Sequence, residues 1–291
     1  MIIDAHAHLW NKQRGRVNGG DVYDIGGGRS WFGDEVRQMM PPYMTDGINS
    51  AQRFLANMDY AGVSGAVITQ EYIDGNQDGY LRQCRAEFAD RLRVCALYEE
   101  QPLGNLDGLD GIKLCAGRLA DRDLTHHLAP FEAANAQGKF ISIDLADGDE
   151  QTGALREIAR QFPDLKIAIG HFGMVTRAGW LEQIRLAEHK NVFIESGGIT
   201  WLFHNEFYPY PSAVRAIREA ADLVGFDKLM WGSDYPRTMT AITYKMSLDF
   251  VEKTNEISEE DKALFLGENA RKFYGFADLP IPQWVRNMVE D

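Results

Sequence analysis

Short apolar runs rich in β-forming residues alternate with longer segments of helical period along almost the whole chain. Eight runs of this kind lie at residues 2–7, 65–69, 93–97, 111–115, 140–145, 166–170, 191–195 and 228–232. Helices are predicted between them at residues 48–61, 76–90, 126–137, 150–162, 178–189, 211–224 and 241–254. This order is typical of repeated βα units around a parallel sheet. We therefore expect an α/β fold, a (β/α)₈ TIM barrel, closed by right-handed crossovers.

The helix predicted at 150–162 shows the local reason for this expectation. Leu155, Ile158, Ala159 and Phe162 recur at helical spacing and give one apolar face for the sheet. An open doubly wound sheet is the alternative. That fold normally has a glycine-rich phosphate loop after its first strand, whereas the first strand here ends in His-Ala-His.

Two segments depart from the alternation. Residues 10–47 form a long loop insert after strand 1, which we expect to fold over the mouth of the barrel as a lid. Residues 255–291 form a C-terminal helical tail, in which Leu264, Phe265 and Phe273 are expected to pack against the barrel. We expect residues 1–291 to form one domain.

The chain of 291 residues suits one such barrel, which typically takes roughly 250 residues. Its net charge of −13 disfavours nucleic acid as a partner, because phosphate binding needs clustered Lys and Arg. No apolar run is long enough for a membrane span, and no signal peptide is recognisable, so a cytoplasmic location is expected. Cys84, Cys95 and Cys115 form no C-x-x-C pair and are interpreted as buried, reduced residues.

Two histidines end the first predicted strand, in the run Asp4-Ala5-His6-Ala7-His8. Strand side chains alternate with period two, so His6 and His8 point to the same face, here the inside of the barrel near its mouth. That geometry suits a shared metal ion or a shared anion. A pair of packed or surface histidines is the alternative, because so short a motif is weak by itself.

The sixth and eighth strands also end in residues that can carry chemistry. His171 follows the sixth apolar run, and Asp234 follows the eighth. The active sites of such barrels lie at the C-terminal ends of the strands. The sequence therefore predicts one site built from His6, His8, His171 and Asp234.

In combination, these residues resemble the amidohydrolase superfamily, in particular its family-two branch of lactonases, hydrolases and non-oxidative decarboxylases. The resemblance includes the runs at 162–166 and 267–274 and covers almost the whole chain. It implies that the strand-one histidine pair and Asp234 hold metal-ligand or substrate-polarising positions. It also implies that His171 assists proton transfer.

One position departs from the family pattern. Metal-dependent relatives carry a further histidine at the end of strand five, where this chain has Asp144. A catalytic zinc site has three protein ligands and a bound water. His6, His8 and Asp234 could supply the three protein ligands, with His171 or Asp144 as an extra ligand. The resemblance leaves two alternatives, no cofactor or one divalent ion, zinc or manganese. The missing histidine favours the metal-free alternative.

Further candidates for substrate binding follow from position, because each lies at or near the end of a predicted strand. They are Lys113, Arg177, Arg237, Glu71, Tyr72, Asp144 and Glu195. The cationic members could hold a substrate carboxylate, for which Arg offers a bidentate fork. An aromatic cluster of Trp201, Phe203, His204, Phe207 and Tyr208 could form a wall of the site or could simply pack.

The leading hypothesis is a hydrolase that opens a small carboxylated or sugar-derived lactone. Asp234 accepts a proton from water, and the histidine cluster polarises the carbonyl. A metal-dependent non-oxidative decarboxylase of an aromatic or dienoic acid is the alternative enzyme. A non-catalytic barrel that binds an acidic metabolite is the alternative from another class, because a fold alone does not establish chemistry. The expected partner is a small anionic or sugar-derived substrate, and the oligomeric state stays open, with a homo-oligomer as one option.

Overall fold

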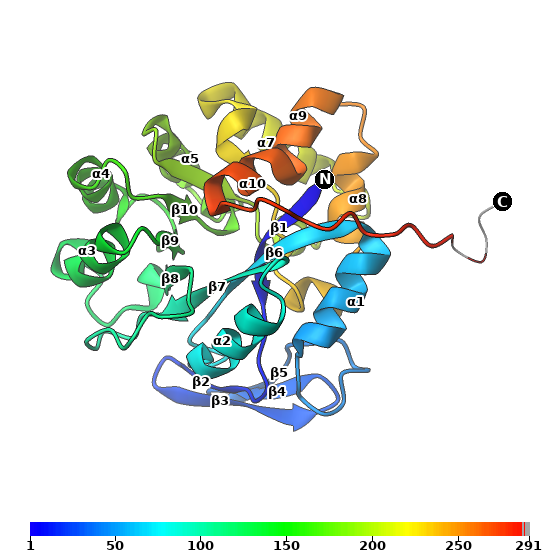
Figure 1. Ribbon diagram of the computed structural model, residues 1–291, viewed down its shortest axis with the longest axis horizontal. Coiled ribbons are helices and arrows are strands. Elements are labelled where there is room, and N and C mark those ends of the chain that lie inside the picture. The colour runs from blue at the N-terminus through cyan, green and yellow to red at the C-terminus, as the bar shows by residue number, and fades with distance from the viewer. Residues whose placement is uncertain (287, 289–291) are drawn as a thin grey trace.

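Eight parallel strands form the barrel in the computed structural model, which describes residues 1–286 and 288 (Figure 1). In sheet order they are β1 (Ile2–His8), β6 (Val63–Thr69), β7 (Leu92–Leu97), β8 (Gly111–Leu114), β9 (Phe140–Ile143), β10 (Ile167–Ile169), β11 (Val192–Glu195) and β12 (Leu229–Met230). This sheet order follows the chain order, as repeated βα units require. The predicted strands and the TIM barrel are confirmed.

The barrel closes between β1 and the segment that follows β12. The backbone N–H of Asp234 donates to the carbonyl of His6 at 2.8 Å, and that of His8 donates to the carbonyl of Tyr235 at 2.8 Å. Because β12 has only two residues, this following segment supplies much of the closing contact. The closure places Asp234 beside the histidine pair of β1.

Helices connect and cover the strands (Figure 1). They are α1 (Ala51–Ala61), α2 (Asp78–Glu87), α3 (Leu128–Ala136), α4 (Thr152–Gln161), α5 (Trp180–Ile184), α6 (Ile199–Leu202), α7 (Pro211–Val224) and α8 (Met246–Glu252). In α4 the predicted apolar face is buried through Leu155, Ile158 and Ala159. The seven predicted helices are present. The short helix α6 was not predicted, and α5 passes into a 3₁₀ turn at Arg185–Glu188.

The insert after β1 is a small antiparallel sheet, so our prediction of a long loop was wrong. Its strands are β2 (Arg14–Val17), β3 (Gly20–Gly26), β4 (Arg29–Phe32) and β5 (Glu35–Gln38). Gly27 (φ 64°) and Gly28 (φ 70°) form the turn between β3 and β4, where positive φ favours glycine. Val17, Val22 and Phe32 are buried in a separate small core under this sheet.

The C-terminal segment closes the other end of the barrel, opposite the insert sheet (Figure 1). It consists of α9 (Glu259–Ala263), a π-helical turn (Leu264–Glu268) and α10 (Asn269–Tyr274). Phe273 packs in one cluster with Ile3 and Met230 of the barrel, and Phe265 is fully buried. Leu264 is half-buried. The predicted helical tail therefore ends at Tyr274, and residues 287 and 289–291 of the predicted range lie outside the described residues.

Two predictions from composition can be compared with the structure. Cys84, Cys95 and Cys115 are all buried and free, as the sequence indicated. In the part of the chain that the structure describes, no helix combines the length and apolar character needed to cross a membrane.

The packing of Phe273 generates a testable prediction. Its side chain is 3% exposed, and its ring lies 4.9 Å from that of Phe193 and 6.4 Å from that of Phe140. Phe273→Ala should lower the free energy of unfolding by about 3–5 kcal/mol, measured by urea denaturation, because it leaves a cavity under the barrel. The matched control is Phe207→Ala, where the ring is 92% exposed and the change should stay within about 0.5 kcal/mol. Equal losses in the two variants would contradict this account of the closure.

Candidate active site

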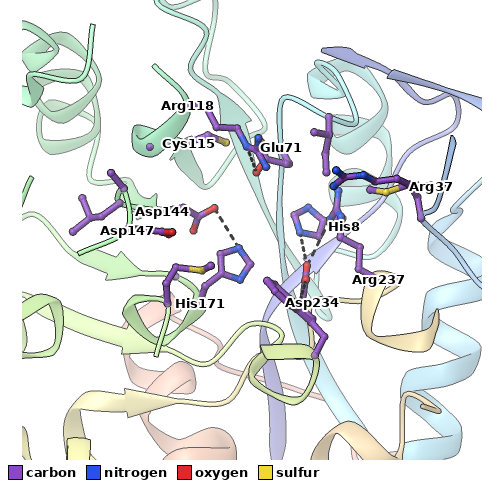
Figure 2. Close-up of a pocket in the computed structure, with 18 of the residues that line it drawn as sticks. His8, Arg37, Glu71, Cys115, Arg118, Asp144, Asp147, His171, Asp234 and Arg237 are labelled. Carbon is purple, nitrogen blue, oxygen red and sulfur yellow. Dashed lines mark hydrogen bonds and ion pairs between the residues drawn. The ribbon is translucent and has the colours of Figure 1, made fainter. Parts of the chain in front are cut away.

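A pocket of about 890 Å³ lies at the C-terminal mouth of the barrel (Figure 2). Strand ends supply titratable side chains of its lining, among them His8, Asp144, His171 and Asp234. The insert sheet and the residues just after it supply Phe32, Arg37, Gln38 and Met39. The insert is therefore a wall of the pocket as well as a separate sheet.

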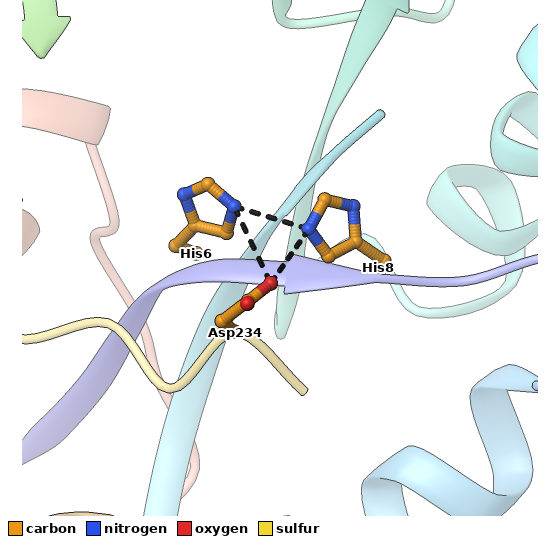
Figure 3. A group of neighbouring side chains, drawn as sticks. All are labelled: His6, His8 and Asp234. Atoms are coloured by element: carbon orange, nitrogen blue, oxygen red, sulfur yellow. Dashed lines mark hydrogen bonds and ion pairs between the residues drawn. The ribbon is translucent and has the colours of Figure 1, made fainter. Parts of the chain in front are cut away.

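Three atoms that could bind a metal ion converge at the floor of this pocket (Figure 3). His6 Nε2 lies 3.1 Å from His8 Nε2, and His8 Nε2 lies 3.0 Å from Asp234 Oδ1. The distance from His6 Nε2 to Asp234 Oδ1 is 3.8 Å. All three side chains are buried. The residues that the sequence singled out on β1 and after β12 therefore form one compact cluster.

Hydrogen bonds from neighbouring strands hold this cluster in place. His6 Nδ1 donates to Glu195 Oε1 at 2.6 Å, because a carboxylate can only accept. A neutral imidazole that donates from Nδ1 carries its lone pair on Nε2, and His6 Nε2 faces the cluster. Glu195 is itself held by the backbone N–H of Gly197 at 2.6 Å, and the indole of Trp201 donates to Asp234 Oδ2 at 2.7 Å.

The backbone is unusual where the site residues leave their strands. Asp234 (φ 56°) and His171 (φ 53°) adopt left-handed conformations that cost energy for residues with a Cβ atom. Gly170 precedes His171 because a Cβ at that position would lie 2.1 Å from Asp144 Oδ1. Both features direct side chains of separate strands toward a common volume.

The protonation of the cluster follows from burial and from neighbouring charges. Burial lowers the pKa of His8 well below its usual value, and the nearby charge of Arg237 lowers it further, so the His8 ring is neutral at pH 7. Burial alone would raise the pKa of Asp234, but the hydrogen bond from His8 and the charge of Arg237 outweigh it and hold that pKa far below its usual range. Asp234 is thus a carboxylate at every physiological pH.

His171 lies on the other side of the pocket floor, between Asp144 and the histidine pair (Figure 2). Its Nδ1 donates to the carbonyl of Gly197 at 2.8 Å, and its Nε2 lies 3.6 Å from Asp144 Oδ2. Asp144 also pairs with Lys113, at 2.6 Å between Nζ and Oδ1. Burial lowers the pKa of His171, but the charge of Asp144 outweighs it and raises that pKa to about 9. His171 is therefore a cation near pH 7.

Most of the permanent charges around the floor cancel in pairs. The pairs are Lys113 with Asp144, Arg237 with Asp74, and Arg118 with Glu71. Asp234 and Glu195 then remain as two buried carboxylates whose closest partners are imidazoles, an indole and a backbone N–H. Buried charge needs compensation, so the site suits a positively charged occupant in addition to the His171 cation.

The His6, His8 and Asp234 donors fit a divalent metal ion. An ion with tetrahedral ligands at 2.0–2.2 Å would place those ligands about 3.4 Å apart, close to the three distances found. Two other groups of donors lie close together, His6 with Asp144 and His171, and Glu71 with Cys115 and Asp144. Both depend on Asp144, whose charge Lys113 already compensates, so they fit an ion less well.

The other predicted substrate-binding residues divide into several groups. Glu71 and Arg237 line the pocket, as does Asp144. Three of them are buried and do not line the pocket: Lys113, Tyr72 and Glu195. The Tyr72 hydroxyl donates a hydrogen bond to the carbonyl of Tyr98. Arg177 lies outside the lining, with a side chain that is 60% exposed and paired with Asp147 at 3.3 Å. Its loop turns outward after His171, so position after a strand was an insufficient guide.

Three arginines of the lining were missed by sequence reasoning. Arg37 ends the insert sheet, and Arg118 and Arg122 follow β8. With Arg237 they place four guanidinium groups on the rim of the pocket, each of them paired with a carboxylate. Arg118 and Arg122 have as their sequence signal a basic residue in a loop after a strand, which Arg177 shares, and Arg37 lies on β5 of the insert, which was not predicted. From the aromatic cluster, Trp201 and His204 line the pocket, whereas Phe207 is exposed.

Comparison with known proteins agrees with this geometry. The family model described as amidohydrolase, family 2, matches residues 3–276. The chain belongs to this family. No curated protein matches this amidohydrolase at a significant level.

Several solved structures share the fold of this amidohydrolase. A probable 2-pyrone-4,6-dicarboxylic acid hydrolase from Acinetobacter baumannii, with citric acid bound, is 18% identical at a TM-score of 0.68, over 94% of this chain and 99% of that chain. An amidohydrolase from Burkholderia multivorans with bound zinc is 16% identical with a TM-score of 0.66, and the match covers 96% of this chain and 100% of that chain. A 5-carboxyvanillate decarboxylase from Sphingomonas paucimobilis is 16% identical with a TM-score of 0.61, and the match covers 95% of this chain and 99% of that chain. At these identities the three structures show the fold alone.

The pairing of His171 with Asp144 predicts a pH dependence for this amidohydrolase. The pKa of His171 in the fold is about 9, above its ordinary value of 6.5, so its charge stabilises the fold fully below pH 6.5. That stabilisation should be lost as the pH rises through about 9. Urea denaturation between these pH values should show the wild type losing more stability than His171→Gln. In an NMR titration, Asp147→Asn should leave the His171 pKa unchanged, and an ordinary pKa in the wild type would contradict the pairing.

Proposed function

We propose that the chain is a hydrolase that opens a small lactone, either carboxylated or derived from a sugar, with water as the nucleophile. The observation that carries this proposal is the convergence of His6, His8 and Asp234 at the floor of a pocket with four guanidinium groups on its rim. The floor offers a carboxylate and imidazoles for reaction at a carbonyl. The rim offers binding groups for an anionic substrate.

The rim supports an anionic substrate through its four arginines. Arg37, Arg118 and Arg122 are about half-exposed, so their guanidinium groups can meet a ligand from solvent. Arg237 lies deeper, next to the floor, with its Nη1 at 3.5 Å from Asp234 Oδ1. Guanidinium groups bind carboxylates through two parallel hydrogen bonds. A carboxylate on the rim would place a lactone ring over the floor.

The reaction assigns one task to each charged group of the floor. Water adds to the lactone carbonyl carbon and gives up a proton to the Asp234 carboxylate. The His8 ring, which donates from Nε2 toward Asp234, orients the carbonyl oxygen. The ring C–O bond then breaks, and the His171 cation supplies a proton to the departing alkoxide. The product is the open hydroxy acid, and the proton on Asp234 returns to His171 through solvent.

A divalent ion is included in this proposal, with His6, His8 and Asp234 as its ligands. When bound, such an ion would polarise the carbonyl and lower the pKa of a water molecule. The missing strand-five histidine favours a metal-free site, whereas the converging donors and the uncompensated carboxylates favour an ion. The zinc in the Burkholderia multivorans relative agrees with the second view.

Non-oxidative decarboxylation of an aromatic or dienoic acid is the second candidate. It is favoured by the His171 cation, which could protonate a ring carbon, and by the decarboxylase among the structural neighbours. A screen of lactones and aromatic acids separates the candidates, because lactone opening releases acid whereas decarboxylation releases CO₂. Tight binding of anions without any turnover would instead support a non-catalytic barrel.

Substitution at Asp234 tests the chemistry directly. Asp234→Asn should lower kcat by about 10²- to 10⁴-fold, because the amide keeps the shape of the side chain but cannot accept a proton. Circular dichroism should show an unchanged fold. Asp59→Asn, which changes an exposed carboxylate that pairs with Arg91 outside the pocket lining, should keep kcat within about threefold. A loss below about tenfold in Asp234→Asn would remove Asp234 from the mechanism.

Metal analysis tests the second part of the proposal. We expect one zinc or manganese ion per chain after dialysis, and loss of both metal and turnover in His6→Ala and His8→Ala. Chelation should abolish activity and the metal should restore it. Full activity in chelator with the same two variants still inactive would instead support the metal-free alternative, in which the histidines act on the carbonyl alone.

A further inference from the structure

A buried carboxylate that the proposed reaction does not use lies behind the cluster. Asp74 follows β6, is 2% exposed and does not line the pocket. Its Oδ2 accepts a hydrogen bond from Arg237 Nη2 at 2.6 Å and lies 3.8 Å from His8 Nδ1. Both of these neighbours contact Asp234, His8 at 3.0 Å and Arg237 at 3.5 Å. Asp74 therefore lies against two of the side chains that surround Asp234.

The atom of His8 that faces Asp74 lacks a partner. His8 Nδ1 is buried and has no hydrogen bond among the described residues. A neutral imidazole that uses Nε2 to bind a cation carries its proton on Nδ1, and a buried proton of this kind needs an acceptor. Asp74 Oδ2 is the carboxylate oxygen within 4.0 Å of it. A movement of less than about 1 Å would bring the two atoms to hydrogen-bond distance.

The other histidine of the cluster already has such an arrangement. His6 Nδ1 donates to Glu195 Oε1 at 2.6 Å, which leaves Nε2 facing the cluster. Carboxylates that accept from the second nitrogen of a metal-binding histidine fix its tautomer and orientation. Asp74 lies beside Nδ1 of His8, just as Glu195 lies beside Nδ1 of His6.

Asp74 is held from its other side by the insert sheet. Gln13 Nε2 donates to Asp74 Oδ1 at 3.3 Å, and Ser30 Oγ on β4 donates to Gln13 Oε1 at 2.5 Å. Gln13 and Ser30 are both buried. These contacts fix Oδ1 and leave Oδ2 directed at Arg237 and His8. The insert sheet is thereby connected to the floor of the pocket through a continuous polar chain.

We propose that Asp74 is the positioning residue of His8: it accepts the Nδ1 proton, directs Nε2 toward the cation site and connects the insert sheet to that site. This inference rests on the proposed function, because it assigns His8 Nε2 to the cluster that binds the divalent ion. Asp74 acts through His8 and Arg237 and does not contact the substrate. No bond to carbon forms or breaks at Asp74.

The experiment measures the Nδ1 proton of His8 and the affinity for Zn²⁺ in the full chain. In protein labelled with ¹⁵N-histidine, wild type loaded with Zn²⁺ should show a downfield, slowly exchanging Nδ1 proton on His8. Asp74→Asn should shift that proton upfield, speed its exchange and weaken Zn²⁺ binding by about 10- to 100-fold. An unchanged proton signal with unchanged affinity in this variant would overturn the proposal.

Two control variants separate the role of Asp74 from other effects. Arg237→Gln removes the same ion pair and also a positive charge beside Asp234, so its Zn²⁺ affinity should stay equal or increase. Asp110→Asn removes a part-buried carboxylate that pairs with Arg85 at 2.8 Å and does not line the pocket. This variant should leave the His8 proton signal and the Zn²⁺ affinity unchanged. Equal weakening in Asp74→Asn and Arg237→Gln would assign the effect to the ion pair and overturn the role toward His8.

The remaining outcomes also decide the matter. If circular dichroism shows that Asp74→Asn does not fold, Asp74→Glu, which keeps a carboxylate, should retain the Nδ1 proton signal and an affinity within about tenfold of wild type. Loss of the signal in a folded Asp74→Glu would overturn the proposal. If the wild type binds no Zn²⁺, the metal part of the proposed function fails. The Nδ1 proton in the metal-free protein then decides the role of Asp74 alone: its presence supports the role and its absence overturns it.

Discussion

The site depends on the seam at which the barrel closes. Asp4 on β1 is fully buried there, and its carboxylate accepts hydrogen bonds from the Ser233 backbone at 2.9 Å, the Ser233 hydroxyl at 2.5 Å and the Tyr244 hydroxyl at 2.9 Å. Burial raises the pKa of Asp4 to about 6, and these donors partly offset that effect. His6 and Asp234 lie immediately beyond this seam on its two sides. Their separation is therefore set by the closure of the barrel.

The second constraint is electrostatic, because the floor buries many charges in a small volume. A buried charge is tolerated when it is paired and hydrogen-bonded. Lys113 and Arg237 each pair with one carboxylate, and Glu195 and Asp74 lie behind the two histidines of β1. This arrangement leaves Nε2 of both imidazoles and one oxygen of Asp234 directed at one point. A divalent ion at that point would find three ligand atoms.

The barrel and the walls of the pocket have separate roles. Strand ends carry the reacting groups, and their positions are determined by the sheet that the solved hydrolase and decarboxylase neighbours share. The rim arginines come from the insert sheet and from loops, which can change without disturbing the barrel. The four arginines that we propose to bind the substrate, Arg37, Arg118, Arg122 and Arg237, belong to segments outside the barrel strands.

The strands and helices of the barrel could be predicted from the chain, because their apolar periods are local, whereas the four strands of the insert were missed. The sequence also indicated His6, His8, His171 and Asp234, because each lies at or just after the end of a predicted strand. Tertiary structure decided which charged residues meet. Arg118 and Arg177 both follow strands, yet only Arg118 lines the pocket, because the direction of a loop depends on packing with distant segments. Asp74 gave no signal in the chain, because its importance arises only when β1 and the segment after β12 come together beside it.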